Sequence, residues 1–536
     1  MERSGFLKSA FFITFSIIIC KVIGLLYVIP FYAMIGSKGG ALYSYAYSIY
    51  AVFLSLSTSG IPIAISKLIS EYQALGYEET KERVYKLGLL AIFIISMFLF
   101  FVMFLSAPML AKIILGGTTG GNSVASVTTV IRIVSTSLWL VPLLAVLRGY
   151  FQGTKQMNVV ALTNIIEQVV RVAVILGGTY LTIRVFHAPV DQAVGFAVFG
   201  STVGALVAFL YLYFVRRKQR RHMAVRSLPT ERKLTNTYLI KKIIIYALPF
   251  LIIEGVQALF SLVDTFTVIR TLVKLGFSTG QAEMVQSIMT TWGSKLNMVI
   301  VSLALGISVS IVPYIAASYA KKERGEVNRH LHEAIIGLSL LILPAALGMH
   351  FLSDSIWTLF YGHDAFASHV FSWFIFIAVS FSFFSLLITI TQTINQTKLV
   401  MKTLLFVLLF KILMNIPAMY LLQQFGVDAY YGPIMVTIIV QIVGSTFLLF
   451  SLSYQANFQF SKTIYYWLKI LLCALIMYWS LKILGLFFPV VGQTRGSAFL
   501  IVCGYVMVGA FLYFLLVWKS GILKQVPLHK KVLKKK

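Results

Sequence analysis

The stretch FSIIICKVIGLLYVIPF occupies residues 15 to 31 and surrounds a single charged side chain, Lys21, with apolar neighbours. An α-helix needs about 20 predominantly apolar residues to cross a bilayer. Because the hydrocarbon core offers backbone groups no water, a run of this length predicts a helix, and it is too long for a barrel strand. The stretch therefore predicts a transmembrane helix with a positive charge near its middle.

The same apolar character extends along the whole chain of 536 residues. Hydrophobic residues make up 59% of the sequence and the mean hydropathy is +0.88, which exceeds the usual share in soluble domains. Apolar runs predict fourteen spans, near residues 10–32, 41–65, 86–111, 124–147, 158–183, 191–215, 243–269, 287–316, 334–352, 369–394, 401–423, 429–453, 464–487 and 497–518. The predicted fold is an all-α polytopic membrane protein.

The basic residues are distributed unevenly. The chain has 45 Lys and Arg against 17 Asp and Glu, and most of the basic residues fall at the amino terminus, in alternate loops and in the tail. This is the positive-inside pattern, and it predicts that both termini are cytoplasmic. The densest clusters are residues 216–242, with ten basic residues, and residues 519–536, with seven. They are interpreted as contacts to anionic membrane lipids or as topology signals, and not as a nucleic-acid surface.

The sequence offers no pattern for chemistry on a substrate. Its cysteines, Cys20, Cys473 and Cys503, lie in apolar spans far apart, so neither a disulfide framework nor a metal site is predicted. Nothing matches a nucleophile triad, a zinc motif or a nucleotide fingerprint, and the loops are too short for a catalytic domain. The chain is therefore predicted to have no catalytic residues and not to be an enzyme.

Comparison of the chain with itself indicates an internal repeat. Gly60 in SLSTSGIPIAIS matches Gly306 in SLALGISVSIV, 246 residues later, and Gly116 matches Gly362 at the same separation. QGTK at 152–155 matches NQTK at 395–398, a separation of 243. Six spans lie between equivalent points, and an even number gives both halves the same direction in the membrane. Such halves are related by an axis along the membrane normal, with the substrate site at their interface.

The repeat divides the chain into predicted parts. Two pseudo-symmetric lobes of six helices are expected, together with two additional helices at the carboxyl end. The predicted parts are an N-lobe at 1–215, a basic cytoplasmic linker at 216–242, a C-lobe at 243–453, helices 13 and 14 at 454–518, and a basic cytoplasmic tail at 519–536.

Helix-breaking residues stand inside the first two spans. Pro30 lies in the first, and Gly60 with Pro62 lies in the second. Proline removes a backbone donor and bends a helix, and transporters use such breaks where backbone lines a cavity. Glycine and proline are also common in membrane helices without that role. The three residues are predicted to be gating positions, with an ordinary compositional role as the alternative.

Charged residues also occur inside the predicted spans, where an isolated charge costs about 2.5 to 3.5 kcal/mol on the insertion scale. Such residues normally face a bundle interior or a wet cavity. The basic residues considered are Lys21, Arg171 and Lys411 near the middle of three spans, with Lys295 and Arg132 further out; the acidic ones are Glu167, Glu254 and Asp264. The cations outnumber the acids, which predicts a net positive interior.

The spacing of these charges separates structural roles from binding roles. Glu167 and Arg171 are four residues apart on one helix face, and a structural pair is favoured over a ligand pair. Lys411 and Asn415 have the same spacing and could form a polar contact between helices. Lys21 has no acidic residue within four positions, so it requires a partner from another helix or an anionic substrate.

Several stretches resemble one family of transporters. They are SGIPIAISKLISEY (59–72), LRGYFQGTKQM (147–157), IIEQVVRV (165–172), LVDTF (262–266) and KILMN (411–415). They are similar to the polysaccharide-exporter branch of the multidrug/oligosaccharidyl-lipid/polysaccharide (MOP) flippase superfamily, and most of all to its Gram-positive MurJ-type lipid II flippases and sporulation relatives. The resemblance covers essentially the whole chain. It implies fourteen helices in two lobes in a bacterial cytoplasmic membrane.

The resemblance also implies a substrate and a site. Lipid II flippases of this branch receive the pyrophosphate of an undecaprenyl-linked sugar precursor in a cationic central cavity that alternates between the two faces of the membrane. On that basis the substrate-binding residues are expected to be Lys21, Arg171, Lys295 and Lys411. Tyr27 stands where Gram-negative relatives have a second arginine in the first helix. Helices 13 and 14 resemble the pair that forms a groove for the polyprenyl tail.

No cofactor is expected, apart from Na⁺ or H⁺ as a coupling ion. Some relatives bind sodium in the second lobe, and the resemblance implies Asp264, Asn415 and Thr437 as the corresponding ligands. Met419 stands where those relatives have a second carboxylate.

The predicted function is therefore a flippase for lipid II or a related polyprenyl-diphosphate sugar, working by alternating access in peptidoglycan and cell-wall synthesis. One alternative is an exporter of another lipid-linked polysaccharide or teichoic repeat unit. A cation-coupled multidrug antiporter is a further alternative, which a net basic interior disfavours.

Overall fold

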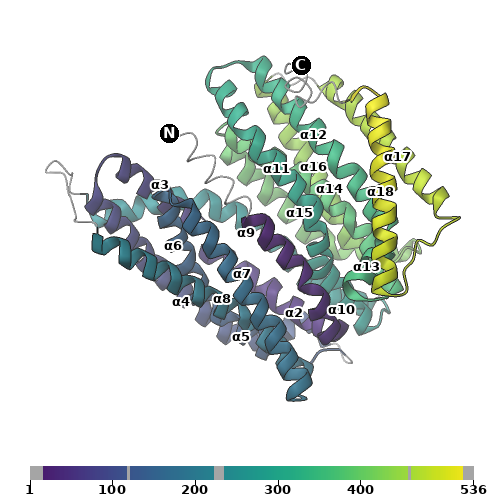
Figure 1. Ribbon diagram of the computed structural model, residues 1–536, viewed down its shortest axis with the longest axis horizontal. Helices are drawn as coiled ribbons and strands as arrows, with labels where there is room; N and C mark the ends of the chain where they lie inside the picture. Colours follow the sequence, from purple (N-terminus) through teal and green to yellow (C-terminus); the bar gives the residue numbers. More distant parts are fainter. Residues whose placement is uncertain (1–15, 59, 118–120, 223–233, 457–459, 523–536) are drawn as a thin grey trace. The chain divides into compact units, whose positions relative to one another are not determined.

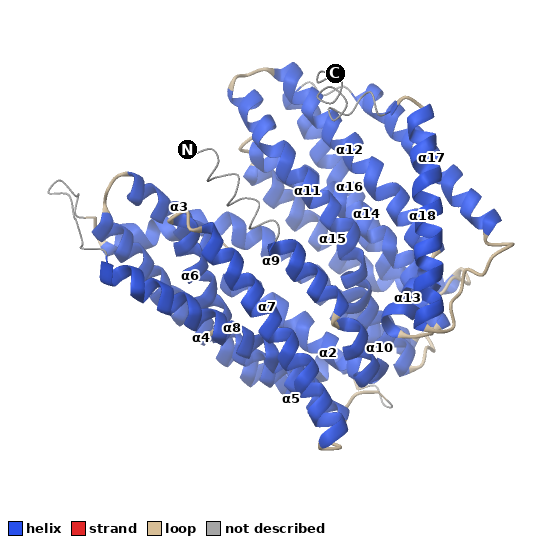
Figure 2. Cartoon of the chain, viewed as in Figure 1, coloured by secondary structure: helices blue, strands red, loops and turns tan. Residues whose placement is uncertain are grey.

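The computed structural model describes residues 16–58, 60–117, 121–222, 234–456 and 460–522 (Figure 1). In these ranges the chain forms helices and no strand (Figure 2). Up to residue 274 the α-helices are α2 (Val28–Thr58), α3 (Ile61–Ala74), α4 (Glu78–Leu115), α5 (Val124–Ser135), α6 (Val141–Gly153), α7 (Met157–Tyr180), α8 (Val190–His222) and α9 (Asn236–Lys274). They are followed by α10 (Thr279–Ser287), α11 (Gly293–Ala320), α12 (Arg324–Phe351), α13 (Ser353–Tyr361), α14 (Ala365–Thr393), α15 (Thr397–Gln424), α16 (Tyr431–Ala456), α17 (Phe460–Leu484) and α18 (Arg495–Lys519). Three short turns of helix, η1 (Thr136–Trp139), η2 (Leu181–Val185) and η3 (Ile288–Trp292), lie within or at the ends of the long ones.

The number of spans agrees with the sequence. Thirteen segments of the described chain are long and apolar enough to cross a membrane, and the first of them runs from Val28 to Ala74. This first segment holds two legs, because the backbone of α2 leaves helical geometry at Gly36, with φ +66°. The leg before Gly36 continues the apolar helix Ser16–Leu26, which carries Lys21. Counting both legs gives fourteen spans, and the predicted all-α polytopic fold is confirmed.

The break between the first two spans therefore lies at Gly36, and Pro30 stands inside the leg that precedes it. A φ of +66° is in the left-handed region, which glycine adopts without steric cost. A second break separates α2 from α3 at Gly60, with φ +82°, and Pro62 occupies the first turn of α3. Proline is tolerated there because that turn has no intrahelical partner for its missing N–H. A gating role for Pro30, Gly60 and Pro62 stays a prediction.

Left-handed backbone positions recur at nearly constant separations and confirm the internal repeat. The separations are 240, 246, 246, 240 and 239 residues for the pairs Gly36 and Gly276, Gly76 and Lys322, Gly116 and Gly362, Lys155 and Asn395, and His187 and Gly426. Each member stands in a connection between consecutive spans, so positive φ values recur at corresponding connections of two six-helix halves.

Two of the sequence matches need adjustment. The N–H of Lys155 donates to the Gln152 carbonyl, and the N–H of Asn395 donates to the Gln392 carbonyl, both at 3.0 Å. Asn395 is therefore the equivalent of Lys155, and the match of QGTK to NQTK is wrong by three residues. Gly306 lies inside α11, whereas its match Gly60 interrupts the chain. Similar letters at these places do not correspond to equal backbone geometry.

The chain divides into two compact units. Unit 1 consists of Met1–Arg270 with Thr279–Glu283, and unit 2 of Thr271–Ser278 with Met284–Lys536. In unit 1, α7 packs against α8, α3 against α6, and α4 against α5. Its core includes Leu239, Ile243 and Ala247 from the first half of α9, so this half of α9 belongs to unit 1.

In unit 2, α11 packs against α12 and α14, α15 against α16, α12 against α17, and α13 against α18. The positions predicted for a linker at 216–242 include the end of α8 and the first residues of α9, and 223–233 lie outside the described residues. Of the predicted tail, 523–536 also lie outside them. The division into lobes at 215 and 243 stays a prediction.

Candidate functional site

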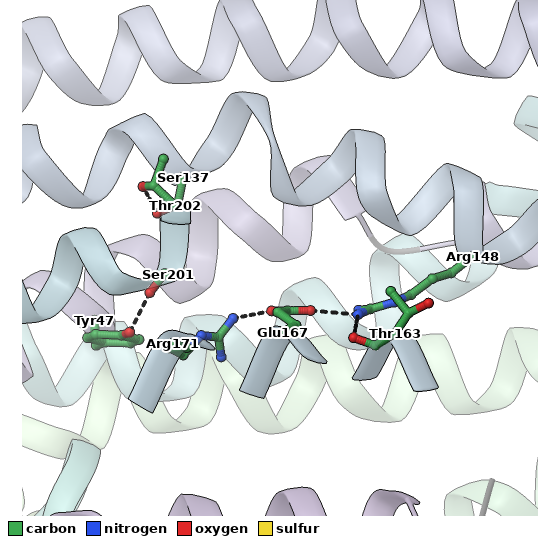
Figure 3. A network of polar contacts seen from close by, with 8 residues as sticks. All are labelled: Tyr47, Ser137, Arg148, Thr163, Glu167, Arg171, Ser201 and Thr202. Carbon is green, nitrogen blue, oxygen red and sulfur yellow. Dashed lines mark hydrogen bonds and ion pairs between the residues drawn. The ribbon is translucent and has the colours of Figure 1, made fainter. Parts of the chain in front are cut away.

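A buried carboxylate in unit 1 is shared by two arginines. Glu167 and Arg171 come from α7, four residues apart on one face, and Arg148 comes from α6 (Figure 3). Arg148 Nη2 lies 2.7 Å from Glu167 Oε2, and Arg171 Nη2 pairs with Glu167 Oε1. The Glu167 residue is 9% exposed. Because a buried charge is tolerated only when it is paired, each arginine lowers the cost of burying this carboxylate.

The turn between α6 and α7 brings the second arginine to the pair. Residues 154–156 reverse the chain between Gly153 and Met157, so the end of α6 returns along the start of α7. Arg148 Nη2 also donates to the Thr163 carbonyl of α7 at 3.3 Å, which fixes the guanidinium along that helix. Two guanidiniums on one carboxylate leave a net charge of about +1, so the cluster of Arg148, Glu167 and Arg171 attracts a further anion.

Lys21 lies on the helix beside this cluster. The neighbouring residue Cys20 is within electrostatic range of Glu167, Arg148 and Arg171. A Cβ added at Gly24, one turn further along, would lie 3.2 Å from Gln168 Nε2 on α7. The Lys21 helix therefore packs against α7 at the height of Glu167. With the half-buried Lys21 included, the charges of this part of unit 1 sum to about +2.

Two pairs of hydroxyl groups lie near Arg171 (Figure 3). The Tyr47 hydroxyl of α2 lies 2.7 Å from Ser201 Oγ of α8, and Ser137 Oγ of η1 lies 2.8 Å from Thr202 Oγ1. Tyr27, where relatives are expected to have an arginine, is 9% exposed, and its hydroxyl lies 3.3 Å from the Tyr43 hydroxyl. This position thus holds a neutral hydrogen-bonding group instead of a second positive charge.

The predicted residues of unit 2 form a separate polar contact. Lys411 on α15 is fully buried, and its Nζ donates to Thr437 Oγ1 on α16 at 2.6 Å. Asn415, one turn after Lys411, is fully buried as well. Lys295 lies at the start of α11, with its Nζ 5.1 Å from the centre of the Trp292 ring. The structure therefore brings Lys411, Asn415 and Thr437 together at one place.

The residues predicted as sodium ligands are divided between the units. Asp264 is buried on α9 in unit 1, whereas Asn415 and Thr437 belong to unit 2. The Thr437 hydroxyl already accepts a hydrogen bond from the Lys411 ammonium. A Na⁺ ion on the same oxygen would lie next to that ammonium, and two like charges at this distance repel each other.

Sequence reasoning missed Arg148. It placed residue 148 just beyond the end of a span, whereas α6 continues to Gly153. The available signal was an arginine in an otherwise apolar helix, one connection before a buried Glu–Arg pair. Sequence reasoning also did not select Gly36 as the break between the first two spans. Among the described residues, no group of three or more His, Cys, Asp or Glu could hold a metal ion.

The fold defines the class of protein. The structure is similar to a solved lipid II flippase MurJ in an inward closed conformation, with a TM-score of 0.69 and 17% identity over 95% of this chain and 98% of that one. It is also similar to an inward-facing multidrug resistance MATE family transporter of the MOP superfamily, with a TM-score of 0.63 and 13% identity over 81% and 95%. The chain thus has the fold of MOP-superfamily membrane transporters, which is the fold that the sequence-based resemblance implies.

The family follows from the sequence itself. The model of the polysaccharide biosynthesis protein family matches residues 6–304, and a MatE model matches residues 290–417. The first match covers more than half of the chain, so the chain belongs to the polysaccharide biosynthesis protein family. Lipid II flippase MurJ of Bacillus subtilis (strain 168) is 29% identical over 98% of this chain and 97% of its own length.

Proposed function

We propose that this protein moves lipid II, or a related undecaprenyl-diphosphate-linked sugar precursor, from the inner to the outer leaflet of the bacterial cytoplasmic membrane for cell-wall synthesis. The relationship to a lipid II flippase over nearly the full length of both chains supports this substrate class. The observation that carries the proposal is the buried cluster in which Glu167 is shared by Arg148 and Arg171, next to the helix that carries Cys20 and Lys21.

The chemistry of the cluster suits a diphosphate. Moving a phosphate group out of water is costly unless cations replace its hydration. Guanidinium groups offer planar pairs of donors that match phosphate oxygens, and Lys21 adds a point charge. In this proposal the diphosphate takes donors from Lys21 and Arg171 while Glu167 retains Arg148, and the polyprenyl tail stays in lipid. Lys295 and Lys411 of unit 2 stay predicted substrate-binding residues, and the diphosphate contacts proposed here are those of unit 1.

The proposal includes alternating access and an orientation. Bending of the first two spans at Gly36 and Gly60, with Pro30 and Pro62 nearby, would alternate the exposure of the cluster. The positive-inside pattern supports a cytoplasmic location for both termini in this proposal. The basic residues of 216–242 and 519–536 would then contact anionic lipids of the inner leaflet.

The proposal includes a coupling ion, and the contacts of Thr437 favour H⁺ over Na⁺. Na⁺ binding by Asp264, Asn415 and Thr437 requires the Lys411 ammonium to leave Thr437. H⁺ makes no such demand. We therefore expect transport to continue when Na⁺ is replaced by K⁺ or choline, and an obligatory Na⁺ requirement would contradict this expectation.

A second candidate is an exporter of another lipid-linked polysaccharide or teichoic repeat unit. The family match favours it, because the family is described by polysaccharide biosynthesis and not by one lipid. Its diphosphate headgroup would use the same cations. A multidrug antiporter for cationic drugs is disfavoured, because the surplus positive charge around Glu167 would repel such substrates.

The decisive experiment depletes the protein in its own host and measures which polyprenyl-linked precursor accumulates on the inner leaflet. We expect lipid II to accumulate and cells to lyse. Rescue by Lys21→Ala should fail while Lys21→Arg retains part of the function, with membrane insertion checked for both variants. If depleted cells grow normally but lose a capsule, the substrate is another lipid-linked polysaccharide and not lipid II. Full rescue by Lys21→Ala would show that Lys21 is not a substrate-binding residue.

A further inference from the structure

Two of the family-like stretches meet outside the Glu167 cluster. From Ile61 onward the first stretch lies in α3, and residues 147–157 hold the end of α6, the turn after it and the first residue of α7. A Cβ added at Gly149 would lie 2.6 Å from the Pro62 carbonyl oxygen, and one at Gly153 would lie 2.7 Å from the Ser66 carbonyl oxygen. The two glycines therefore allow the helices to pack at backbone distance, which brings the polar ends of both stretches together.

A cavity of about 650 Å³ opens where these ends meet. It is lined by polar or charged side chains from both stretches, with apolar residues between them. The polar lining residues are Ser66, Lys67, Ser70, Glu71, Gln152 and Lys155. They lie at the end of unit 1 that carries the turns after α3 and α6, which is the end predicted to be cytoplasmic. The volume is in the range of small-molecule sites.

The charges of this cavity favour an anion. Glu71 is paired with Lys242 of α9, with Oε1 and Nζ 2.7 Å apart, so its carboxylate is compensated within unit 1. Lys67 and Lys155 remain as the cations of the lining. The Lys67 ammonium lies 4.0 Å from the centre of the Tyr246 ring, which holds its side chain beside the cavity. The four charges sum to about +2.

The Lys155 side chain is placed by an unusual backbone. Its φ is +60°, in the left-handed region, which glycine and asparagine adopt more readily than other residues do. The equivalent connection in the second half uses Asn395, with φ +64°. Lys322 has the same φ in another turn, so the role of the Lys155 ammonium rests on its place in the cavity lining.

We propose that Lys67 and Lys155, with Ser66, Ser70 and Gln152, form a second substrate site that binds the phosphorylated sugar headgroup of a lipid-linked saccharide before it reaches the Glu167 cluster. The ammonium groups bind phosphate oxygens, and the hydroxyl and amide groups bind sugar hydroxyls. A phosphate ion alone would leave most of the cavity unfilled. This inference rests on the proposed function, because it takes the same class of substrate.

The test measures binding of a water-soluble, short-chain lipid II analogue to the full-length protein in phosphatidylcholine nanodiscs. Lys67→Gln and Lys155→Gly should each weaken binding about tenfold, as expected for loss of one charge-assisted contact. Glycine suits the left-handed position of residue 155, so Lys155→Gly removes the ammonium without disturbing the turn. Lys86 is an exposed lysine near the start of α4 and does not line the cavity. The control variant Lys86→Gln should therefore bind the analogue as the wild type does.

Competition identifies the source of the anion. Inorganic phosphate or added phosphatidylglycerol should compete only at concentrations well above that of the analogue. If either one competes at the analogue's own concentration, the cavity is a site for simple anions or phospholipids and not for a sugar phosphate. Equal binding by the wild type, Lys67→Gln and Lys155→Gly would overturn the second site and leave the proposed function standing. No binding by the wild type itself would count against the proposed function.

Discussion

Arg148 on α6 lies 2.7 Å from a carboxylate that sequence spacing assigns to Arg171 alone, the buried Glu167 of α7. The carboxylate therefore connects two helices as well as two turns of one helix. Removing it would leave two guanidiniums facing each other in a largely buried place, while removing Arg148 leaves the Glu167–Arg171 pair intact.

Glu167→Gln should destabilise the protein more than Arg148→Gln does. Loss of the shared carboxylate is expected to cost about 2 to 3 kcal/mol in the free energy of unfolding, because two buried cations lose their counter-charge. The measurement is thermal or denaturant unfolding of the purified protein in detergent. Glu326→Gln is the control, because the Glu326 and Arg329 side chains are 43% and 55% exposed and such pairs contribute about 0 to 1 kcal/mol. A larger loss of unfolding free energy for Arg148→Gln than for Glu167→Gln would contradict the conclusion that both arginines depend on Glu167.

Gly149→Ala and Gly153→Ala should each lower stability by about 1 to 3 kcal/mol, as overpacking does. The added methyl group would lie within 2.7 Å of a backbone carbonyl of α3, which cannot move aside as a flexible side chain can. Gly177→Ala on α7 is the matched control, since its Cβ would meet nothing within 4 Å. The measurement is the unfolding temperature of the three variants. Unchanged unfolding temperatures for both Gly149→Ala and Gly153→Ala would show that α3 and α6 are not in backbone contact.

Thr437→Val should destabilise unit 2 through Lys411. The substitution keeps the shape of the side chain and removes an acceptor of the buried ammonium, at an expected cost of about 1 to 3 kcal/mol. Lys411→Met removes the charge as well, so the double variant with Thr437→Val should lose less than the sum of the two single losses. A double-mutant cycle of unfolding free energies measures this coupling. Strict additivity would mean that the hydrogen bond of 2.6 Å contributes nothing to stability.

Gly60→Ala should be damaging, while Gly306→Ala at the matching place of the repeat should be tolerated. Residue 60 has φ +82°, where alanine costs about 1 to 2 kcal/mol, and its Cβ would also meet the Ala247 backbone of α9. Gly306 lies in the middle of α11 with open space around it. Complementation together with membrane yield tests the pair. Equal tolerance of the two substitutions would show that the break at Gly60 is not required.

Much of the fold could be predicted from the sequence, because the relevant signals are local. Fourteen apolar runs follow from the thickness of a bilayer, and the repeat of turns follows from glycines and short connections that recur at similar separations. The exact residue-by-residue correspondence between the two halves could not be predicted from the sequence. Similar letters placed Lys398 opposite Lys155, whereas the backbone places Asn395 there, because turn geometry and not residue identity defines the equivalence.

The sequence by itself determined that this is a membrane protein with charges inside its spans, and that Glu167 and Arg171 share one helix face. Helical periodicity is enough for both conclusions. Only the tertiary structure decided which helix supplies the second partner, that Arg148 reaches Glu167, that Lys411 donates to Thr437, and that the first two spans separate at Gly36. These relationships depend on how helices pack against each other, and distances between side chains from different helices are not encoded in spacing along the chain.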